Sequence, residues 1–335
     1  MLGLNILPDV LPSSEPSLRL VILMPLRDDW ESASVLIRQI DQVLRSQSCK
    51  ADVLLIDDDS QQRWDSADFR GDYVAVQSIR ALRLRLNLGH QRAIAIGLAH
   101  VFKTTRCDAI LIMDADGEDT PDGVSKLIDA FRQDHGALLI FAERSRRAES
   151  FLFRCLYGVY RMLHRLLTGL SVRVGNFSIV PAAYLNTLVV QSELWNHYAA
   201  SIFRSKRPFR MIPIPRGRRI AGTSRMNFVA LVTHGLSAIS VFGDIVGTRL
   251  LIASLLGSLL ATGGIIALVV RLFAHQTISG WAVYTAGTLA MILVQFITMA
   301  AIFTFFMLAN RTNLGFVPLR DYSLFIAEQI DIYAP

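Results

Sequence analysis

Five carboxylates gather at the end of an aliphatic run in the stretch AILIMDADGEDTPDGV, residues 109–124. They are Asp114, Asp116, Glu118, Asp119 and Asp122. Negative charges this close repel one another unless a positive charge lies among them. Asp114 and Asp116 stand two positions apart on a chain leaving a strand, so a turn between them lets both face one point. Mg²⁺ and Mn²⁺ prefer such oxygen ligands and complete their shells with phosphate and water. The spacing predicts a divalent metal ion that carries a diphosphate and neutralises it as it departs.

Two further acidic segments end other aliphatic runs. LRLVILMPL (18–26) continues into RDD, and ADVLLI (51–56) continues into DDDS. Continuous apolar runs are typical of strands covered on both faces, and here they alternate with helical patterns such as residues 31–45. We therefore expect an α/β domain with a mainly parallel sheet and helices on both faces. Ligands bind beyond the carboxyl ends of such strands, so the three acidic segments should meet at one edge. Separate solvated loops are the alternative for any one of them.

In this order, four segments of the chain resemble the family 2 glycosyltransferases with the GT-A fold. They are PLRDD (25–29), DDDS (57–60), NLGHQRAIAIG (87–97) and DADGEDTP (114–121). Within that family the chain is most similar to the polyprenyl-phosphate glycosyltransferases, the group that contains dolichol-phosphate mannose synthase. The resemblance extends over residues 20–244, with transmembrane helices appended. It implies a Rossmann-like GT-A catalytic domain and a nucleotide-sugar donor linked to UDP or GDP.

The resemblance also implies site residues. The first motif assigns ribose binding to Asp29, and the second places Asp58 near the base. The donor site then comprises Pro25, Leu26, Arg27, Asp29, Asp58, Asp114, Ala115 and Asp116. The family's acidic motif makes Asp114, Asp116 and Glu118 the ligands of Mg²⁺ or Mn²⁺. A late family motif, R-x-x-G-x-S-K, is similar to residues 219–225, which end in Ser224 and Arg225.

The chain departs from the family pattern at several of these positions. Asp28 replaces an asparagine, Asp59 a glycine, Glu118 a glutamine or histidine, and Arg225 a lysine. An arginine keeps the charge of a lysine but changes its geometry. These departures bear on the sugar and the metal more than on the fold. No Q-x-x-R-W sequence follows the acidic motif, which disfavours a processive polysaccharide synthase.

Residues 194–243 contain no Asp or Glu and many arginines. Electrostatic binding to anionic lipid headgroups would explain the cluster. Binding of phosphate would also explain it, because arginine can hold phosphate with two hydrogen bonds. We expect Arg219, Ser224 and Arg225, together with Arg144, to bind the acceptor phosphate. Asp116, Arg219 and Arg225 are the expected catalytic residues. Nucleic acid also fits a basic patch, but the adjacent apolar spans argue against it.

Two segments lack any charge, residues 250–270 and 281–309, and each is long enough to cross a bilayer. We predict a leader (1–17), a GT-A domain (18–225), an interfacial amphipathic helix (226–247), transmembrane helices (248–273 and 281–309) and a cytoplasmic tail (310–335). Basic residues flank the spans on one side, which places the catalytic domain and both termini in the cytoplasm of an integral membrane protein. A bacterial inner membrane is the expected location. Glycines in the first span would allow close helix packing in a homo-oligomer.

A phosphate monoester is already anionic near neutral pH, so it attacks a sugar without a strong general base. The leading hypothesis is a metal-dependent, inverting transfer of one sugar to a polyprenyl phosphate such as undecaprenyl phosphate, for a cell-envelope glycan. Transfer to a hydroxyl-bearing membrane lipid is the alternative, with Glu193 or His197 as the base, although a structural role is favoured for His197. The motifs VRVGNFS (172–178) and LWNHYAA (194–200) lie in the acceptor region and fit either acceptor. A non-catalytic accessory protein on a decayed enzyme fold is a further alternative.

Overall fold

The α/β part of the chain is built on one mixed sheet of eight strands. The computed structural model describes residues 17–62, 64–144, 158, 162–169, 174–222, 228–275, 280–312 and 315–334. The strands are β1 (Leu18–Leu26), β2 (Cys49–Asp57), β3 (Val76–Leu84), β4 (Ala109–Ile112), β5 (Leu139–Arg144), β6 (Val174–Pro181), β7 (Phe209–Ile214) and β8 (Ile326–Tyr333). Their order across the sheet is β7-β5-β6-β4-β1-β2-β3-β8.

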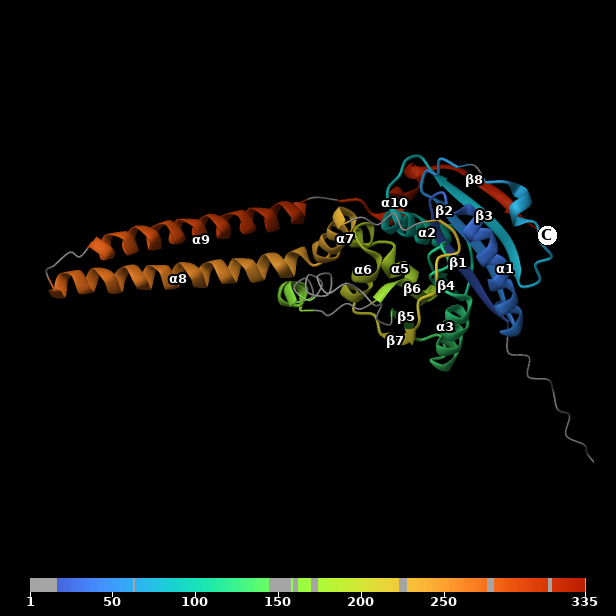
Figure 1. Cartoon of the computed structure of the whole chain (residues 1–335), viewed down its shortest axis with the longest axis horizontal. Coiled ribbons are helices and arrows are strands. Elements are labelled where there is room, and N and C mark those ends of the chain that lie inside the picture. Colours follow the sequence, from blue (N-terminus) through green and yellow to red (C-terminus); the bar gives the residue numbers. More distant parts are fainter. Residues whose placement is uncertain are drawn as a thin grey trace, which may run out of the picture.

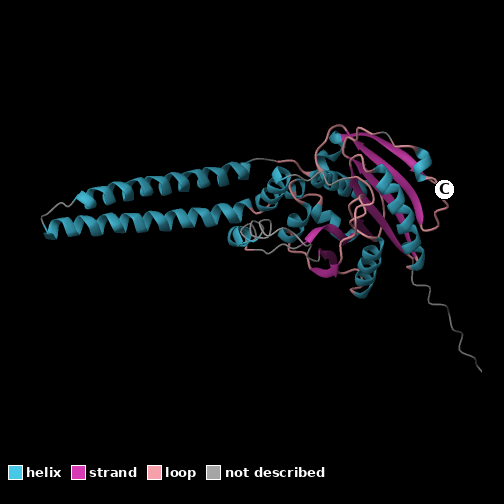
Figure 2. Ribbon diagram, in the orientation of Figure 1, coloured by secondary structure: helices cyan, strands magenta, loops and turns pink. Residues whose placement is uncertain are grey.

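Helices cover both faces of this sheet, as Figure 2 shows. The longer helices of the domain are α1 (Trp30–Ser46), α2 (His90–Thr104) and α3 (Pro121–Gln133), and the shorter ones are α5 (Leu185–Leu188), α6 (Tyr198–Arg204) and α10 (Pro318–Asp321). In β1 alternate residues serve opposite faces. Ile22 packs into the core under α1 and α3, and Leu23 packs into the core under α2 and α6. Burial on both faces explains the uninterrupted apolar runs and confirms the expected α/β architecture.

Most neighbouring strands are parallel, but β6 and β8 are exceptions. β6 runs antiparallel to β4 and β5, and β8 runs antiparallel to β3. The parallel strands β4, β1 and β2 lie side by side, so their carboxyl ends form one edge. Because β6 is antiparallel, its first residues lie at the same edge as the last residues of β4 and β5. This edge carries the acidic segments.

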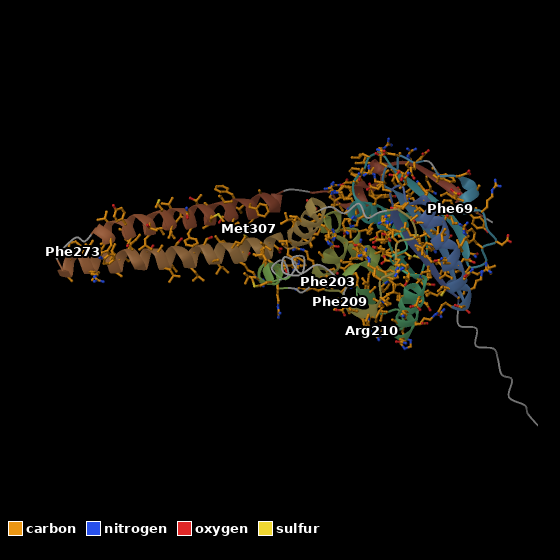
Figure 3. All side chains as sticks on the ribbon, viewed as in Figure 1. Phe69, Phe203, Phe209, Arg210, Phe273 and Met307 are labelled. Carbon is orange, nitrogen blue, oxygen red and sulfur yellow. The ribbon has the colours of Figure 1, made fainter. Side chains whose placement is uncertain are left out.

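A hairpin of long apolar helices projects from the catalytic domain (Figure 1). It is formed by α8 (Gly243–His275) and α9 (Gly280–Thr312), both long and apolar enough to cross a membrane. Their most apolar windows are only 17% and 0% buried, so they are not core helices of the domain. Figure 3 shows the side chains that stand out from the hairpin, including Phe273 at its far end and Met307 nearer the domain. Both helices are longer than the predicted spans.

The helix α7 (Phe228–Ser240) precedes the hairpin and lies within the segment predicted as interfacial. Val232 and Leu236 on this helix are 44% and 60% exposed. Ala238 is buried and packs in a small cluster with Ala200 of α6. One side of α7 therefore packs against the domain, while another side exposes apolar side chains.

Residues 318–333, within the segment predicted as a cytoplasmic tail (310–335), belong to the α/β domain. After α9 the chain forms α10 and then β8, which completes the edge of the sheet beside β3. The backbone nitrogen of Leu319 also donates to the carbonyl of Val189, 2.9 Å away. The domain is therefore discontinuous in sequence, with the helical hairpin inserted before its last strand.

Candidate active site

The acidic segments after β1 and β4 meet through one arginine. The guanidinium of Arg219 contacts Asp29 Oδ1 at 2.8 Å and Asp116 Oδ2 at 3.1 Å. These three side chains are only about one-fifth exposed or less. The predicted convergence of these two segments is thus observed, and Arg219 lies beside the predicted donor residues.

The loop after β7 carries Arg219 and lies along the backbone of the acidic motif. The nitrogen of Ile220 donates to the carbonyl of Asp116 at 2.9 Å, and that of Gly217 donates to the carbonyl of Glu118 at 2.8 Å. A Cβ at Gly217 would lie 2.8 Å from the carbonyl oxygen of Gly117. Only glycine permits this approach, so the loop and the motif are held together as one unit.

The positive charge beside the carboxylates comes from arginine in this structure. Arg219 pairs with Asp116, and Arg216 forms an ion pair with Glu118. Burial, followed by the charge of the neighbouring Asp114 carboxylate, raises the pKa of Asp116 to about 6. In the described part of the chain, no group of three or more His, Cys, Asp or Glu side chains is arranged to hold a metal ion. The predicted triad of Asp114, Asp116 and Glu118 is therefore not assembled here, because Glu118 is engaged by Arg216.

Asp114 and Asp116 alone still fit a divalent ion. Mg²⁺ is commonly bound by one or two carboxylates together with substrate phosphates and water, rather than by a cage of protein ligands. Asp114 and Asp116 are both half-buried and separated by one residue in sequence, and the Asp114 charge contributes to the raised pKa of Asp116, a repulsion that a cation would relieve. The residues present thus suit a metal that arrives with its diphosphate.

Asp58, expected near the base, organises the loop that leads into α2. Its carboxylate oxygens accept hydrogen bonds from the nitrogens of Leu88 at 2.6 Å and Gly89 at 2.8 Å. Burial raises the pKa of Asp58, while these two backbone hydrogen bonds act in the opposite direction. The side chain therefore fixes the start of α2 beside the predicted donor site.

The two aspartates that depart from the family pattern lie in loops at this edge, and Asp28 holds the backbone of residues 61 and 62. Asp28 Oδ1 accepts from the nitrogens of Gln61 and Gln62 at 2.7 and 2.8 Å. Asp28 and Asp59 have φ values of 57° and 59°, in the left-handed region that aspartate and asparagine tolerate best after glycine. The replacement of a glycine by Asp59 is thus compatible with the loop geometry.

The remaining predicted site residues differ in burial and position, and two of them lie outside the part of the chain that the structure describes. Pro25 and Leu26 are buried in β1, Ala115 is 3% exposed, and the Arg27 Nε lies among the buried polar atoms that have no hydrogen-bond partner. Arg144 ends β5 at the same edge of the sheet. Ser224 and Arg225 lie outside the described residues.

A buried polar network connects α2, β6 and α6, and residue types alone did not identify it. The Gln91 Nε2 donates to Asn176 Oδ1 at 3.0 Å, and the Gln91 Oε1 accepts from the nitrogen of Tyr198 at 2.6 Å. The hydroxyls of Ser178 and Tyr198 are 2.8 Å apart. The motifs VRVGNFS and LWNHYAA supply three residues of this network, Asn176, Ser178 and Tyr198.

His197 has a structural role in this arrangement. Its Nδ1 accepts from the nitrogen of Ala200 at 3.3 Å and caps α6, while its Nε2 lies 3.3 Å from the Nε2 of His234 on α7. Burial, followed by the nearby His234, lowers the pKa of His197 to about 3. Glu193, the other candidate base, pairs with Arg204 at 3.2 Å.

Comparison with known proteins agrees with this description. Residues 22–186 match the family described as Glycosyl transferase family 2. The chain is 26% identical over 256 residues to an undecaprenyl-phosphate 4-deoxy-4-formamido-L-arabinose transferase of Salmonella choleraesuis, and 25% identical to the protein of that name in Salmonella paratyphi B. Each match covers 74% of both chains.

Among solved structures, two similar chains are phosphoglycerate glycosyl transferases. Glucosyl-3-phosphoglycerate synthase from Mycobacterium tuberculosis has a TM-score of 0.49 at 14% identity, covering 69% of this chain and 80% of that one. Mannosyl-3-phosphoglycerate synthase from Rubrobacter xylanophilus has a TM-score of 0.46 at 12% identity, covering 67% and 72%.

The sheet order, the acidic edge and the family match define an α/β enzyme of the GT-A fold, a glycosyltransferase. Residues 22–186, which match glycosyl transferase family 2, include the carboxylates Asp29, Asp58, Asp114 and Asp116.

Proposed function

We propose that this enzyme transfers a single sugar, with inversion, from a UDP- or GDP-linked donor to a polyprenyl phosphate at a membrane surface. The observation that carries the proposal is the acidic edge itself, where Asp29 and Asp116 are joined by Arg219, on a domain attached directly to an apolar helical hairpin. The Salmonella relatives, named as undecaprenyl-phosphate transferases, supply the class of acceptor.

The donor would lie along the carboxyl ends of β2, β1 and β4. Asp58 lies at the end of β2, where the base is expected, and Asp29 lies at the end of β1, where the ribose is expected. Asp114 and Asp116 follow β4 and would hold Mg²⁺ or Mn²⁺ at the diphosphate. When bound, the ion supplies positive charge that stabilises the leaving nucleoside diphosphate. Participation of Glu118 as a third ligand requires it to leave Arg216.

The acceptor would approach from the side of α7. The proposed acceptor-phosphate residues are Arg144 at the end of β5, Arg219 at the acidic edge, and Ser224 and Arg225 in the segment that leads to α7. Exposed apolar residues on α7 suit contact with acyl chains or an isoprenoid. A phosphate monoester carries its own negative charge and needs no strong general base. This agrees with the structural contacts of the two candidate bases, since His197 caps α6 and Glu193 pairs with Arg204.

A transfer assay on detergent-purified protein tests this function. Undecaprenyl phosphate is combined with Mn²⁺ or Mg²⁺ and a panel of UDP- and GDP-sugars, for the native protein, Asp116→Ala and Asp122→Ala. Asp122 is an exposed carboxylate paired with Lys126 at 2.6 Å, so it is a matched control in the same motif. We expect a metal-dependent sugar-phosphate-lipid that Asp116→Ala abolishes and Asp122→Ala leaves intact.

Calorimetric binding of UDP and GDP, with and without Mn²⁺, supplies a readout independent of transfer. We expect Asp116→Ala to remove the metal dependence of nucleotide binding. Metal-dependent binding without any lipid product would retain the donor site and overturn the polyprenyl-phosphate acceptor, making hydroxyl-bearing lipids the next acceptors to assay. Nucleotide binding that ignores metal would overturn the metal site.

A further inference from the structure

The start of β6 occupies a distinctive place along the catalytic edge. In the sheet, β6 lies between β4, which leads into Asp114, and β5, which ends at Arg144. The antiparallel register pairs Ile112, the last residue of β4, with Ser178; beyond this pair β6 extends to Asn176 and further, while the chain that leaves β4 leads to Asp114. Asn176 therefore lies beside the metal motif, on the side of the proposed acceptor site.

The order of residues along the edge matches the order of groups in the reaction. From β2 to β5 it runs from Asp58 through Asp29 and Asp114 to Asn176 and finally Arg144. Under the proposed function, these correspond to base, ribose, diphosphate, an intermediate position, and acceptor phosphate. The transferred sugar must lie between the diphosphate that it leaves and the phosphate that attacks it. Asn176 occupies that intermediate position.

The hydrogen-bond network fixes which atom Asn176 presents. The nitrogen of Tyr198 can only donate, so the atom of Gln91 that it contacts, 2.6 Å away, is the oxygen Oε1. The other arm of Gln91 is then the nitrogen Nε2, a donor, and the atom of Asn176 that it contacts at 3.0 Å is the oxygen Oδ1. The orientation of both amides thus follows from one backbone N–H, and Asn176 Nδ2 is the amide atom that Gln91 does not contact.

This nitrogen has two N–H donors, and no residue that the structure describes accepts a hydrogen bond from it. Asn176 is 6% exposed, and among the described residues its Nδ2 contacts no acceptor. It is not among the buried unpartnered polar atoms of the described chain, so it retains some accessible surface. A buried amide with an unused donor at the edge of an active site suits an oxygen acceptor on a ligand.

We propose that Asn176 binds a hydroxyl of the transferred sugar through its Nδ2, and that Gln91 is the positioning residue that holds the amide in this orientation. The assignment rests on the proposed function for the identity of the neighbouring sites. A sugar hydroxyl can accept from Asn176 and donate in turn to a carboxylate of the acidic edge, which satisfies both of its hydrogen-bonding capacities. The pair therefore contributes to the choice of donor sugar.

The first test compares native protein with Asn176→Ala for binding of bare nucleotides and nucleotide sugars. The probes are UDP and UDP-glucose, GDP and GDP-mannose, and the other nucleotide sugars of the panel, each with Mn²⁺. We expect Asn176→Ala to weaken the preferred nucleotide sugar about 10-fold or more while leaving its bare nucleotide unchanged. An equal loss for both, or a native protein that binds every nucleotide sugar no better than its nucleotide, would overturn the assignment.

The second test removes the partner hydroxyl from the ligand. Native protein should discriminate against one monodeoxy analogue of the preferred donor sugar, and Asn176→Ala should lose that discrimination alone. Asn186→Ala is the matched control, because Asn186 is an exposed asparagine whose Oδ1 also accepts one hydrogen bond, from Thr187. Discrimination that survives in Asn176→Ala against every analogue would contradict a sugar contact.

The role of Gln91 is tested by Gln91→Met, which keeps the volume but frees the Asn176 amide to turn over. We expect a smaller loss of the same discrimination, and a double variant with Asn176→Ala that is no worse than Asn176→Ala alone. Additive losses would show that Gln91 acts elsewhere. These binding tests need no acceptor, so a failure to transfer to undecaprenyl phosphate would overturn the proposed function without deciding the role of Asn176.

Discussion

At the scale of single residues, the site shows how buried carboxylates are neutralised before any substrate arrives. Arg219 bridges Asp29 and Asp116, and Arg216 pairs with Glu118. Under the proposed function, a metal-bound diphosphate would bring both charges, and these arginine contacts would be exchanged for contacts to the substrate. The fork of Arg219 is suited to that exchange, because guanidinium binds carboxylate and phosphate in the same geometry.

We predict that Arg219→Lys impairs transfer severely. A lysine provides one ammonium group and cannot reach two carboxylates with a planar fork, so kcat/KM should fall by about 10-fold or more, in line with loss of a charged hydrogen bond. The measurement is the steady-state rate of sugar transfer. Arg218→Lys, at an exposed neighbouring position, should retain native activity. Equal rates for both variants would contradict the role given to Arg219.

His197 predicts a dependence of stability on pH. Burial lowers its pKa to about 3 in the folded protein, against about 6.5 when unfolded. Between these values the unfolded chain binds more protons, so stability must fall as pH drops below about 6.5, by at most about 1.4 kcal/mol per pH unit.

The check is the melting temperature in detergent at pH 7.5 and 5.5, for native protein and His197→Asn. Asparagine retains an oxygen that can cap α6 but does not titrate, so the acid-induced drop in Tm should shrink. His135→Asn, at an exposed position with φ of 50°, should keep the native drop. A full drop in His197→Asn would exclude His197 as its source.

At the scale of elements, β8 makes the C-terminal segment part of the sheet of the catalytic domain. It pairs with β3 from Ile79 and Tyr333 to Leu84 and Ile326. The nitrogen of Arg85 donates to the carbonyl of Phe325 at 2.9 Å, and the rings of Tyr73 and Tyr333 meet edge to face, 4.9 Å apart. The strand thus covers an edge of the sheet and adds side chains to the core.

We predict that deletion of residues 326–335 destabilises the catalytic domain. The deletion exposes the hydrogen-bonding edge of β3 and the apolar groups beneath β8, so Tm should fall by at least about 5 °C and aggregation should increase. Thermal unfolding and size-exclusion chromatography in detergent measure both. Glu328→Gln removes only an exposed ion pair with Arg83, 3.5 Å long, and should change little. A deletion variant with native Tm would show that β8 does not contribute to the stability of the catalytic domain.

At the scale of the whole molecule, the catalytic domain and the hairpin are joined at both ends. On the entering side, Arg204 of α6 donates to Asp244 at 2.6 Å and to the carbonyl of Val241 at 2.9 Å. On the returning side, Phe316 packs against Trp195, with ring centroids 3.7 Å apart. In Figure 1 both ends of the hairpin accordingly meet the same domain. The hairpin is held by two attachments and not by a single linker.

This arrangement predicts the membrane topology. Because β1 and β8 belong to one sheet, the catalytic domain and the C-terminal strand must lie on one side of the membrane, and the tip of the hairpin must lie on the other. The test is labelling by a membrane-impermeant maleimide, added outside intact spheroplasts to variants without native cysteines. Ala274→Cys, near the tip, should react, whereas Ala334→Cys should react only after permeabilisation. Labelling of Ala334→Cys in intact spheroplasts would reverse the predicted cytoplasmic orientation.

The sequence by itself determined the class of fold and the residues of the acidic edge. Buried strands require continuous apolar runs, and abrupt carboxylates after such runs mark the edge where parallel strands end, so Asp29, Asp114 and Asp116 were identifiable without coordinates. The apolar spans were identifiable for the same kind of reason, since a lipid-facing helix can carry almost no charge. Both patterns depend on residue types at neighbouring positions, so they can be recognised in the sequence alone.

Only the tertiary structure decided how those residues are partnered. Arg216 and Arg219 reach the acidic motif from a loop about a hundred positions later, and no periodicity records such a contact. The same holds for Gln91, Asn176 and Tyr198, whose amide orientations depend on hydrogen bonds between three separate elements. The incorporation of residues 326–333 into the sheet likewise depends on an edge formed by β3. Contacts between residues that are distant in sequence form only when the chain folds, and these contacts give the site its geometry.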